Sequence, residues 1–95
     1  VNPSYENHSD DVKVSSNEGN DCIIVQLQNN SDVSIDEMEY IVVFYKGDDI
    51  SDISYANYVY DVKPGEEVTE KVSTRGVEYD KYEVYLNQAH TFGLD

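Results

Sequence analysis

Acidic side chains are the most abundant groups in this sequence that could do chemistry. The 95 residues include 20 Asp and Glu against 6 Lys and Arg, a net charge of −14. A pair of carboxyl groups could serve as the acid and base of a glycosidase, but that reaction needs a cleft between the two groups. A chain of this length leaves little room for such a cleft, and adjacent acids are expected by chance in so acidic a sequence. Adjacent acids occur at Asp10 with Asp11, Asp36 with Glu37, Asp48 with Asp49, and Glu66 with Glu67.

Nucleophilic catalysis would require a base beside a nucleophile. The two histidines, His8 and His90, stand near the ends of the chain, and we expect both at the surface. Cys22 is the only cysteine, so the chain has no intrachain disulfide. With no histidine near it in sequence, we expect it to act as a small core hydrophobe. We therefore expect no enzymatic activity.

Calcium is the cofactor that the acidic loops suit best, because it takes about six to eight oxygen ligands from converging loops. The stretch "GDDISD" offers Asp48, Asp49 and Asp52. Their spacing matches no EF-hand loop. The sequence therefore favours a solvated acidic loop and no cofactor, with calcium at these three residues as the alternative.

Tyrosine is the other informative residue type, with nine Tyr, two Phe and no Trp. A tyrosine makes a strand face apolar and hydrated at once, and it supplies contact area at low entropic cost. The strand pattern places Tyr45 and Tyr85 on outward faces and Tyr55 in a loop, so these three are the candidate ligand-binding residues. Tyr40, Tyr58 and Tyr60 are expected to be half-buried in the core.

Short strands must position these residues. Apolar side chains alternate with polar ones over residues 22–28, 38–46 and 81–88. Turn signals recur every 8–12 residues, as at "NNSD", "KGDD" and "KPGEE". No amphipathic helix is indicated, and residues 50–54 and 57–63 appear as two separate strands. The pattern predicts an all-β fold, an antiparallel immunoglobulin-like β-sandwich of about seven strands.

The alternation also predicts which side chains form the core. We expect six of them to be buried between two sheets: Val25, Leu27, Val42, Phe44, Val84 and Leu86. The strand "MEYIVVFYK" carries a second apolar face with Ile41, Val43 and Tyr45. Cover by the Tyr55 loop or by the tail around Phe92 is the favoured explanation, with a partner surface or plain β-propensity as alternatives.

Charge and hydropathy limit the partners. A net charge of −14 repels nucleic acids and anionic membrane faces. No run of residues approaches the length of a membrane span, so this segment is not expected to insert into a bilayer. Residues 1–10 are polar and unpatterned and are expected to form an arm or linker, followed by the sandwich domain at 11–95. The polar start without methionine indicates a domain of a longer chain.

The order of several motifs resembles the FxLYD domains, small extracytoplasmic β-sandwiches of bacteria. The matching stretches are "QNNSD" at 28–32, "VVFYKGD" at 42–48, "KPGEE" at 63–67 and "YEVYL" at 82–86. The family's F-x-L-Y-D would fall on residues 42–46, where only Tyr45 is identical. The resemblance implies an exported or cell-surface module, and it carries over no catalytic residue.

Together these features predict a non-enzymatic module of a larger exported bacterial protein, secreted or anchored at the cell surface. Its expected role is that of a spacer or protein-interaction domain. The alternative is a carbohydrate- or peptide-binding module that uses outward-facing tyrosines.

Overall fold

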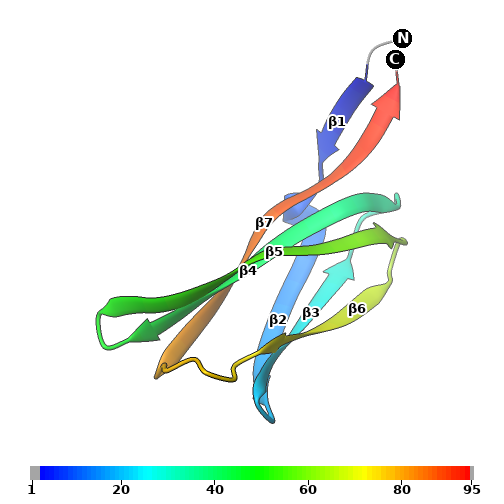
Figure 1. The fold of residues 1–95 in the computed structure, drawn as a ribbon. Coiled ribbons are helices and arrows are strands. Elements are labelled where there is room, and N and C mark those ends of the chain that lie inside the picture. Colours follow the sequence, from blue (N-terminus) through cyan, green and yellow to red (C-terminus); the bar gives the residue numbers. More distant parts are fainter. Residues whose placement is uncertain (1–2, 95) are drawn as a thin grey trace.

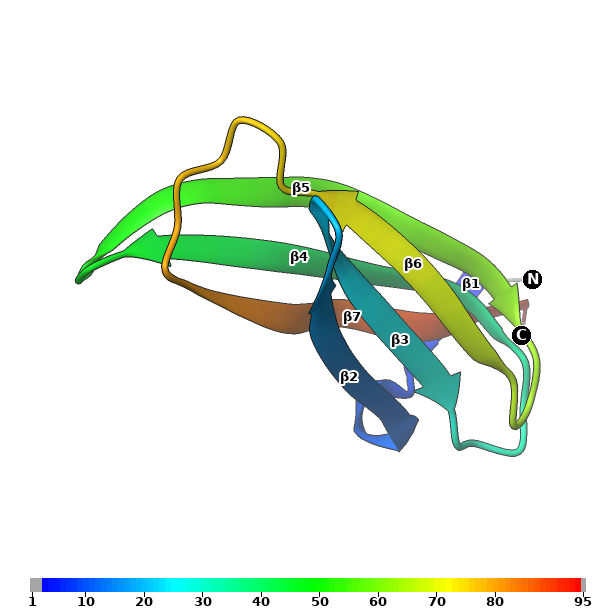
Figure 2. The same cartoon turned by 90° about the horizontal axis from the view of Figure 1, so that it is seen from below.

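The chain folds into two antiparallel β-sheets packed face to face (Figure 1). The computed structural model describes residues 3–94, with side chains for residues 6–92. One sheet has four strands in the order β1-β7-β4-β5, and the other has three in the order β2-β3-β6, crossing the first at an angle (Figure 2). The predicted all-β sandwich of seven strands is thus confirmed. The elements are β1 (Pro3–Asn7), the short 3-10 helix η1 (Ser9–Asp11), β2 (Val12–Gly19), β3 (Cys22–Asn29), β4 (Ile35–Lys46), β5 (Asp49–Val62), β6 (Glu67–Ser73) and β7 (Lys81–Leu94).

The strand order shares part of the immunoglobulin plan. β3 pairs with β6 and β4 pairs with β7, as strands B with E and C with F do in that plan. The edge beside β7, however, is taken by the N-terminal strand β1 rather than by a final strand of the chain. The immunoglobulin-like topology is therefore not confirmed. Within residues 3–94 no helix has the length and apolar character needed to cross a bilayer.

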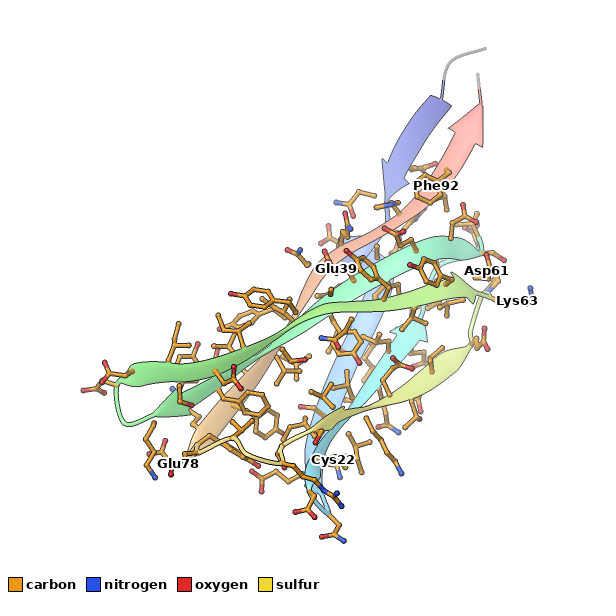
Figure 3. All side chains as sticks on the ribbon, viewed as in Figure 1. Cys22, Glu39, Asp61, Lys63, Glu78 and Phe92 are labelled. Carbon is orange, nitrogen blue, oxygen red and sulfur yellow. The ribbon has the colours of Figure 1, made fainter. Side chains whose placement is uncertain are left out.

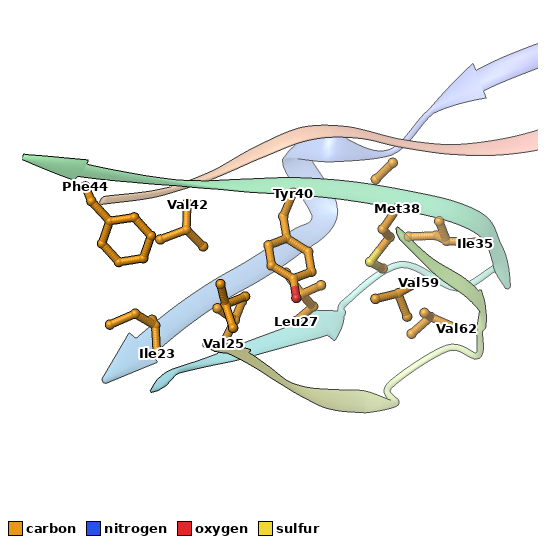
Figure 4. Close-up of a cluster of buried hydrophobic side chains, with 12 residues drawn as sticks. Ile23, Val25, Leu27, Ile35, Met38, Tyr40, Val42, Phe44, Val59 and Val62 are labelled. Atoms are coloured by element: carbon orange, nitrogen blue, oxygen red, sulfur yellow. The ribbon is translucent and has the colours of Figure 1, made fainter. Parts of the chain in front are cut away.

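The core lies between the sheets and follows the alternation of β3 and β4 (Figure 4). Strict alternation points every second side chain of a strand to the same face. The predicted core is correct: Val25, Leu27, Val42 and Phe44 are buried, and Val84 and Leu86 pack half-buried against them. The remaining members of the buried cluster are Ile23, Ile35, Met38, Tyr40, Val59, Val62, Val72 and Ala89.

β5 is one continuous strand, although two separate strands were expected at 50–54 and 57–63. A β-bulge at residues 55–56 joins the two parts. Tyr40 pairs with Asn57 and Val42 pairs with Ser54, so β5 has one more residue in this interval than β4. Ala56 absorbs the extra residue with a φ of 56°. The Asn57 amide holds the bulge by donating to the carbonyl oxygens of Tyr40 and Ser54, each at 3.1 Å.

The bulge also sets the faces of the residues that follow it. Tyr58 and Tyr60 were expected to lie half in the core, and that prediction was wrong. Val59 points inward and is buried, whereas Tyr58 and Tyr60 point outward. Val62 returns to the core after Asp61, whose φ is 54°.

β7 runs without a break from Lys81 through the tail around Phe92 to Leu94. Tyr40 pairs with Leu86 and Glu39 pairs with Gln88, so Asn87 is the extra residue of a second bulge. The bulge reverses the phase of the strand, and Ala89 rather than Gln88 points into the core.

Residues 3–7, within the stretch predicted to be a polar arm or linker, form the strand β1. β1 pairs with the end of β7 from Pro3 opposite Leu94 to Asn7 opposite His90, and the resulting two-stranded ribbon projects from the body (Figure 1). The backbone of the ribbon extends past the three-stranded sheet (Figure 1).

A buried asparagine closes the end of β3. Asn29 is fully buried, and its side-chain amide donates to the carbonyl oxygens of Val33 at 2.8 Å and of Val62 at 2.9 Å. Its side-chain oxygen accepts hydrogen bonds from the backbone N–H and the hydroxyl of Ser31. One side chain thus joins the ends of β3 and β5 to the loop that leads into β4.

A tyrosine hydroxyl reaches the edge of the core beside a carboxylate. The Tyr40 ring is buried, and its hydroxyl lies 3.3 Å from Oε1 of Glu70 on β6. Burial, together with the Glu70 carboxylate, raises the pKa of Tyr40 well above its usual range.

We expect alkaline conditions to destabilise the fold partly through Tyr40. Above about pH 10 the unfolded chain loses this proton while the folded chain keeps it. Since the folded-state pKa is the higher of the two, the stabilisation is complete below about pH 10 and decreases as pH rises. Urea unfolding of the wild type and of Tyr40→Phe from about pH 8 to pH 11.5 should therefore show a shallower alkaline decline for the variant. Parallel declines would contradict this role.

Candidate binding surface

The side chains of the four-stranded sheet that point away from the three-stranded sheet form what we call the outer face. Residues paired directly across an antiparallel ladder share a face. The outer-face residues of the central strand β4 are Glu37, Glu39, Ile41, Val43 and Tyr45, paired on β7 with His90, Gln88, Tyr85, Glu83 and Lys81. On β5 their partners are Tyr60 opposite Glu37, Tyr58 opposite Glu39, Ile53 opposite Val43 and Ile50 opposite Tyr45.

The second apolar face of β4, with Ile41, Val43 and Tyr45, forms the centre of the outer face. Val43 is only 6% exposed, and Ile41 and Tyr45 are half-buried. No described segment crosses the outer side of the four-stranded sheet in the ribbon view (Figure 1), and Phe92 lies on the projecting ribbon (Figure 3). The expected cover by the Tyr55 loop or the tail is therefore wrong. Neighbouring strands on both sides shield Val43, because β4 is central in its sheet.

At one end of the outer face, a lysine is held between aromatic and acidic side chains. The Lys81 ammonium lies 4.6 Å from the centre of the Tyr45 ring and 3.8 Å from Oε1 of Glu83. The Tyr85 hydroxyl donates a hydrogen bond to the other oxygen of Glu83. The pKa of Tyr85 is raised above its usual range, mainly by this hydrogen bond to Glu83 and to a smaller extent by a hydrogen bond with Tyr45. We call these four residues the Lys81 cluster.

A second group of tyrosines and carboxylates lies towards the other end. The rings of Tyr58 and Tyr60 stack with centroids 6.2 Å apart and an interplanar angle of 16°. They stand opposite Glu39 and Glu37, and a hydrogen bond to the Glu39 carboxylate raises the pKa of Tyr58. We call these four residues the Tyr58 cluster. Tyr58 is 41% exposed and Tyr60 is 60% exposed, so both rings are open to solvent.

Polar side chains of β7 hold the carboxylates of the Tyr58 cluster in place. The Asn87 amide at the bulge donates to Oε1 of Glu39 at 2.7 Å, and the Gln88 amide reaches both glutamates at 3.4 Å. Nε2 of His90 lies 3.6 Å from Oε1 of Glu37. Among the described residues, the only lysine or arginine ion pairs are Lys81 with Glu83 and Arg75 with Asp21. The two glutamates therefore have no lysine or arginine partner.

The structure brings together two of the three predicted ligand-binding tyrosines. Tyr45 and Tyr85 meet in the Lys81 cluster. Tyr55 instead lies in the β5 bulge, 68% exposed, and belongs to neither cluster. Tyr58 and Tyr60 were missed, because their faces depend on the bulge. The sequence did offer one signal for an outward face near them. Glu37 and Glu39 stand two positions apart on β4, with the same spacing as Tyr58 and Tyr60 on β5.

The predicted calcium ligands do not form a site. Asp48 lies in the turn between β4 and β5, Asp49 pairs with Lys46, and Asp52 pairs with Phe44 farther along the hairpin. Across the described side chains, no group of three His, Cys, Asp or Glu residues is placed to hold a metal ion. We therefore do not propose calcium at these residues.

The groups considered for catalysis lie apart. Cys22 is half-buried at the start of β3. The histidines are mostly buried rather than at the surface as expected: His8 lies 3.6 Å from Asp11, and His90 faces Glu37. No pocket opens in the part of the chain that the structure describes.

Fold and surface together define an antiparallel β-sandwich whose four-stranded sheet carries an uncovered tyrosine- and glutamate-bearing face. Comparisons with protein-family models, curated proteins and solved structures find no match to this chain.

Proposed function

We propose that this chain is a non-enzymatic interaction module of a larger exported bacterial protein and that the outer face is the surface by which it binds a protein partner. The observation that carries the proposal is the gathering of exposed tyrosines, Tyr58, Tyr60 and Tyr85, on one face that no described segment covers. Tyrosine is enriched in protein interfaces, where it provides contact area at low entropic cost. The absence of a pocket in the described residues suits an extended partner better than a small ligand.

The position of the ends supports an interaction domain over a spacer. Pro3 pairs with Leu94, so the chain enters and leaves the sandwich side by side (Figure 1). A spacer that extends a chain is most effective when its ends lie at opposite poles. Here the 48 Å length of the molecule would add little reach. The extracytoplasmic location rests on the resemblance to FxLYD domains.

A carbohydrate is the second candidate ligand. The stacked, solvent-exposed rings of Tyr58 and Tyr60 offer aromatic surface to a sugar ring, and the carboxylates of Glu37 and Glu39 stand opposite them as hydrogen-bond acceptors. A glycan array probed with the wild type tests this alternative directly.

We expect a random-peptide display library selected on the wild type to yield ligands for the outer face. Their affinity for the double variant Tyr58→Ser/Tyr60→Ser should decrease roughly tenfold or more, as for central aromatic residues of an interface. Tyr55→Ser is the matched control, since it removes an exposed tyrosine outside both clusters, and it should leave binding unchanged. Ligands retained equally by the double variant, or no enrichment over an unrelated acidic domain, would contradict the proposal.

A further inference from the structure

The Lys81 cluster shows how the outer face holds a cation. The ammonium group of Lys81 sits over the Tyr45 ring and beside the Glu83 carboxylate. Both contacts are attractive: the ring face carries a partial negative charge, and the carboxylate is an opposite charge. The chain thus fills one tyrosine–glutamate arrangement with a lysine of its own.

The Tyr58 cluster has the same chemistry without such a lysine. Two exposed rings stand beside two glutamates, and no lysine or arginine pairs with either carboxylate. Amide donors from Asn87 and Gln88 hold the carboxylates without neutralising them, and among the described side chains the basic group beside Glu37 is the His90 ring. In a chain of net charge −14, this end of the face is complementary to a cationic partner.

The geometry of β5 indicates the shape of that partner. β5 is an edge strand, so its outer side is open to an added strand. The uncharged residues 57–60, between the bulge and Asp61, form its regular part here. Tyr58 and Tyr60 are two positions apart, about 7 Å along a strand. An extended partner segment beside β5 would place its alternate side chains on the outer face with the same spacing.

We propose that the Tyr58 cluster binds an extended segment of a protein partner that carries lysine or arginine at alternate positions. The cationic groups lie over Tyr58 and Tyr60 and beside Glu37 and Glu39, as Lys81 lies over Tyr45 and beside Glu83. This assignment rests on the proposed function and specifies the chemistry of the partner. It excludes acidic segments, which the glutamates repel.

The probe is a fluorescein-labelled peptide, Gly-Lys-Ser-Lys-Gly-Lys-Ser-Lys, titrated with the protein and followed by fluorescence anisotropy. We expect saturable binding that weakens with salt, and none for the peptide with glutamate in place of lysine. Glu37→Gln/Glu39→Gln should weaken binding roughly fivefold or more, and Tyr58→Ser/Tyr60→Ser likewise. The charge-matched control Asp48→Asn/Asp49→Asn, on the hairpin turn outside the outer face, should change it less than about twofold. Melting temperatures of all variants verify folding, and a misfolded tyrosine variant leaves the glutamate comparison decisive.

In the peptide and tetramethylammonium titrations, three results would overturn the inference. Equal weakening by the two charge-matched pairs would show that net charge alone attracts the peptide. Absence of saturable binding would remove the site. Binding of tetramethylammonium with the affinity of the peptide would assign the cluster to a small ammonium ligand instead of a protein segment. The display selection distinguishes failure of this inference from failure of the proposed function. Selected peptides that bind the outer face but contain no lysine or arginine would support the proposed function and refute only the cationic partner.

Discussion

Replacing Phe44 by alanine is expected to lower the free energy of unfolding by about 3–5 kcal/mol. The Phe44 side chain is 1% exposed and packs edge-on against the Tyr79 ring, with centroids 5.1 Å apart and an interplanar angle of 60°. Truncation removes this contact and leaves a cavity between the sheets, opposite Ile23 (Figure 4). For a domain of this size the melting temperature should fall by about 15 °C or more. Urea unfolding measures the loss, with an unchanged m-value if the unfolded state is unaffected.

The chain offers a matched control in its second phenylalanine. Phe92 is 48% exposed on the β1–β7 ribbon, outside the buried cluster. Phe92→Ala makes the same chemical change, and it should cost less than about 1 kcal/mol. Equal losses for the two variants would show that the buried cluster around β4 does not dominate stability.

Asn29→Ala is expected to cost about 3 kcal/mol or more, although it removes only a small polar side chain. The variant leaves the carbonyl oxygens of Val33 and Val62 without their donor and Ser31 without its acceptor. Each buried donor or acceptor that is left without a hydrogen-bond partner lowers stability by about 1–3 kcal/mol. In this variant several such groups lose their partner together. Thermal and urea unfolding measure the change.

Two further substitutions separate hydrogen bonding from other effects at this position. Asn30→Ala, in the exposed neighbour, should alter stability by no more than about 0.5 kcal/mol. Asn29→Asp keeps the acceptor but loses the amide donor, and it buries a charge, so it should be at least as destabilising as alanine. A mild effect of both Asn29 variants would mean that water replaces the amide.

The parts of the fold that the sequence predicted are those governed by strict alternation. Over residues 23–27 of β3 and 38–44 of β4, an apolar residue stands at every second position facing the other sheet, and the faces of Val25, Leu27, Val42 and Phe44 were correct. The parts that it did not predict depend on irregular backbone. The β5 bulge uses a positive φ at Ala56, a residue that gives no turn signal, and the faces of residues 57–60 follow from it.

The candidate surface was predictable to the same extent. Tyr45 and Tyr85 lie where β4 and β7 pair in regular register, from Ile41 opposite Tyr85 to Tyr45 opposite Lys81, and both were assigned outward. Tyr58 and Tyr60 lie beyond the bulge and were assigned inward. The role of Asn29 was also hidden, because an asparagine before "NSD" has the same sequence signature whether its amide faces solvent or two buried carbonyl groups.

The β1–β7 ribbon has a mechanical consequence. Pro3 lies opposite Leu94 and Asn7 opposite His90, so tension between the two ends of the chain acts first on the outermost pair of the ladder. Hydrogen bonds of an antiparallel pair run perpendicular to the strands, and such a load opens them one after another, like a zipper, instead of shearing them together. Releasing the five residues of β1 frees about 17 Å of chain. The residues that form the Tyr58 and Lys81 clusters lie outside the paired residues of the ribbon, so under weak tension the ends would yield while the outer face stays assembled.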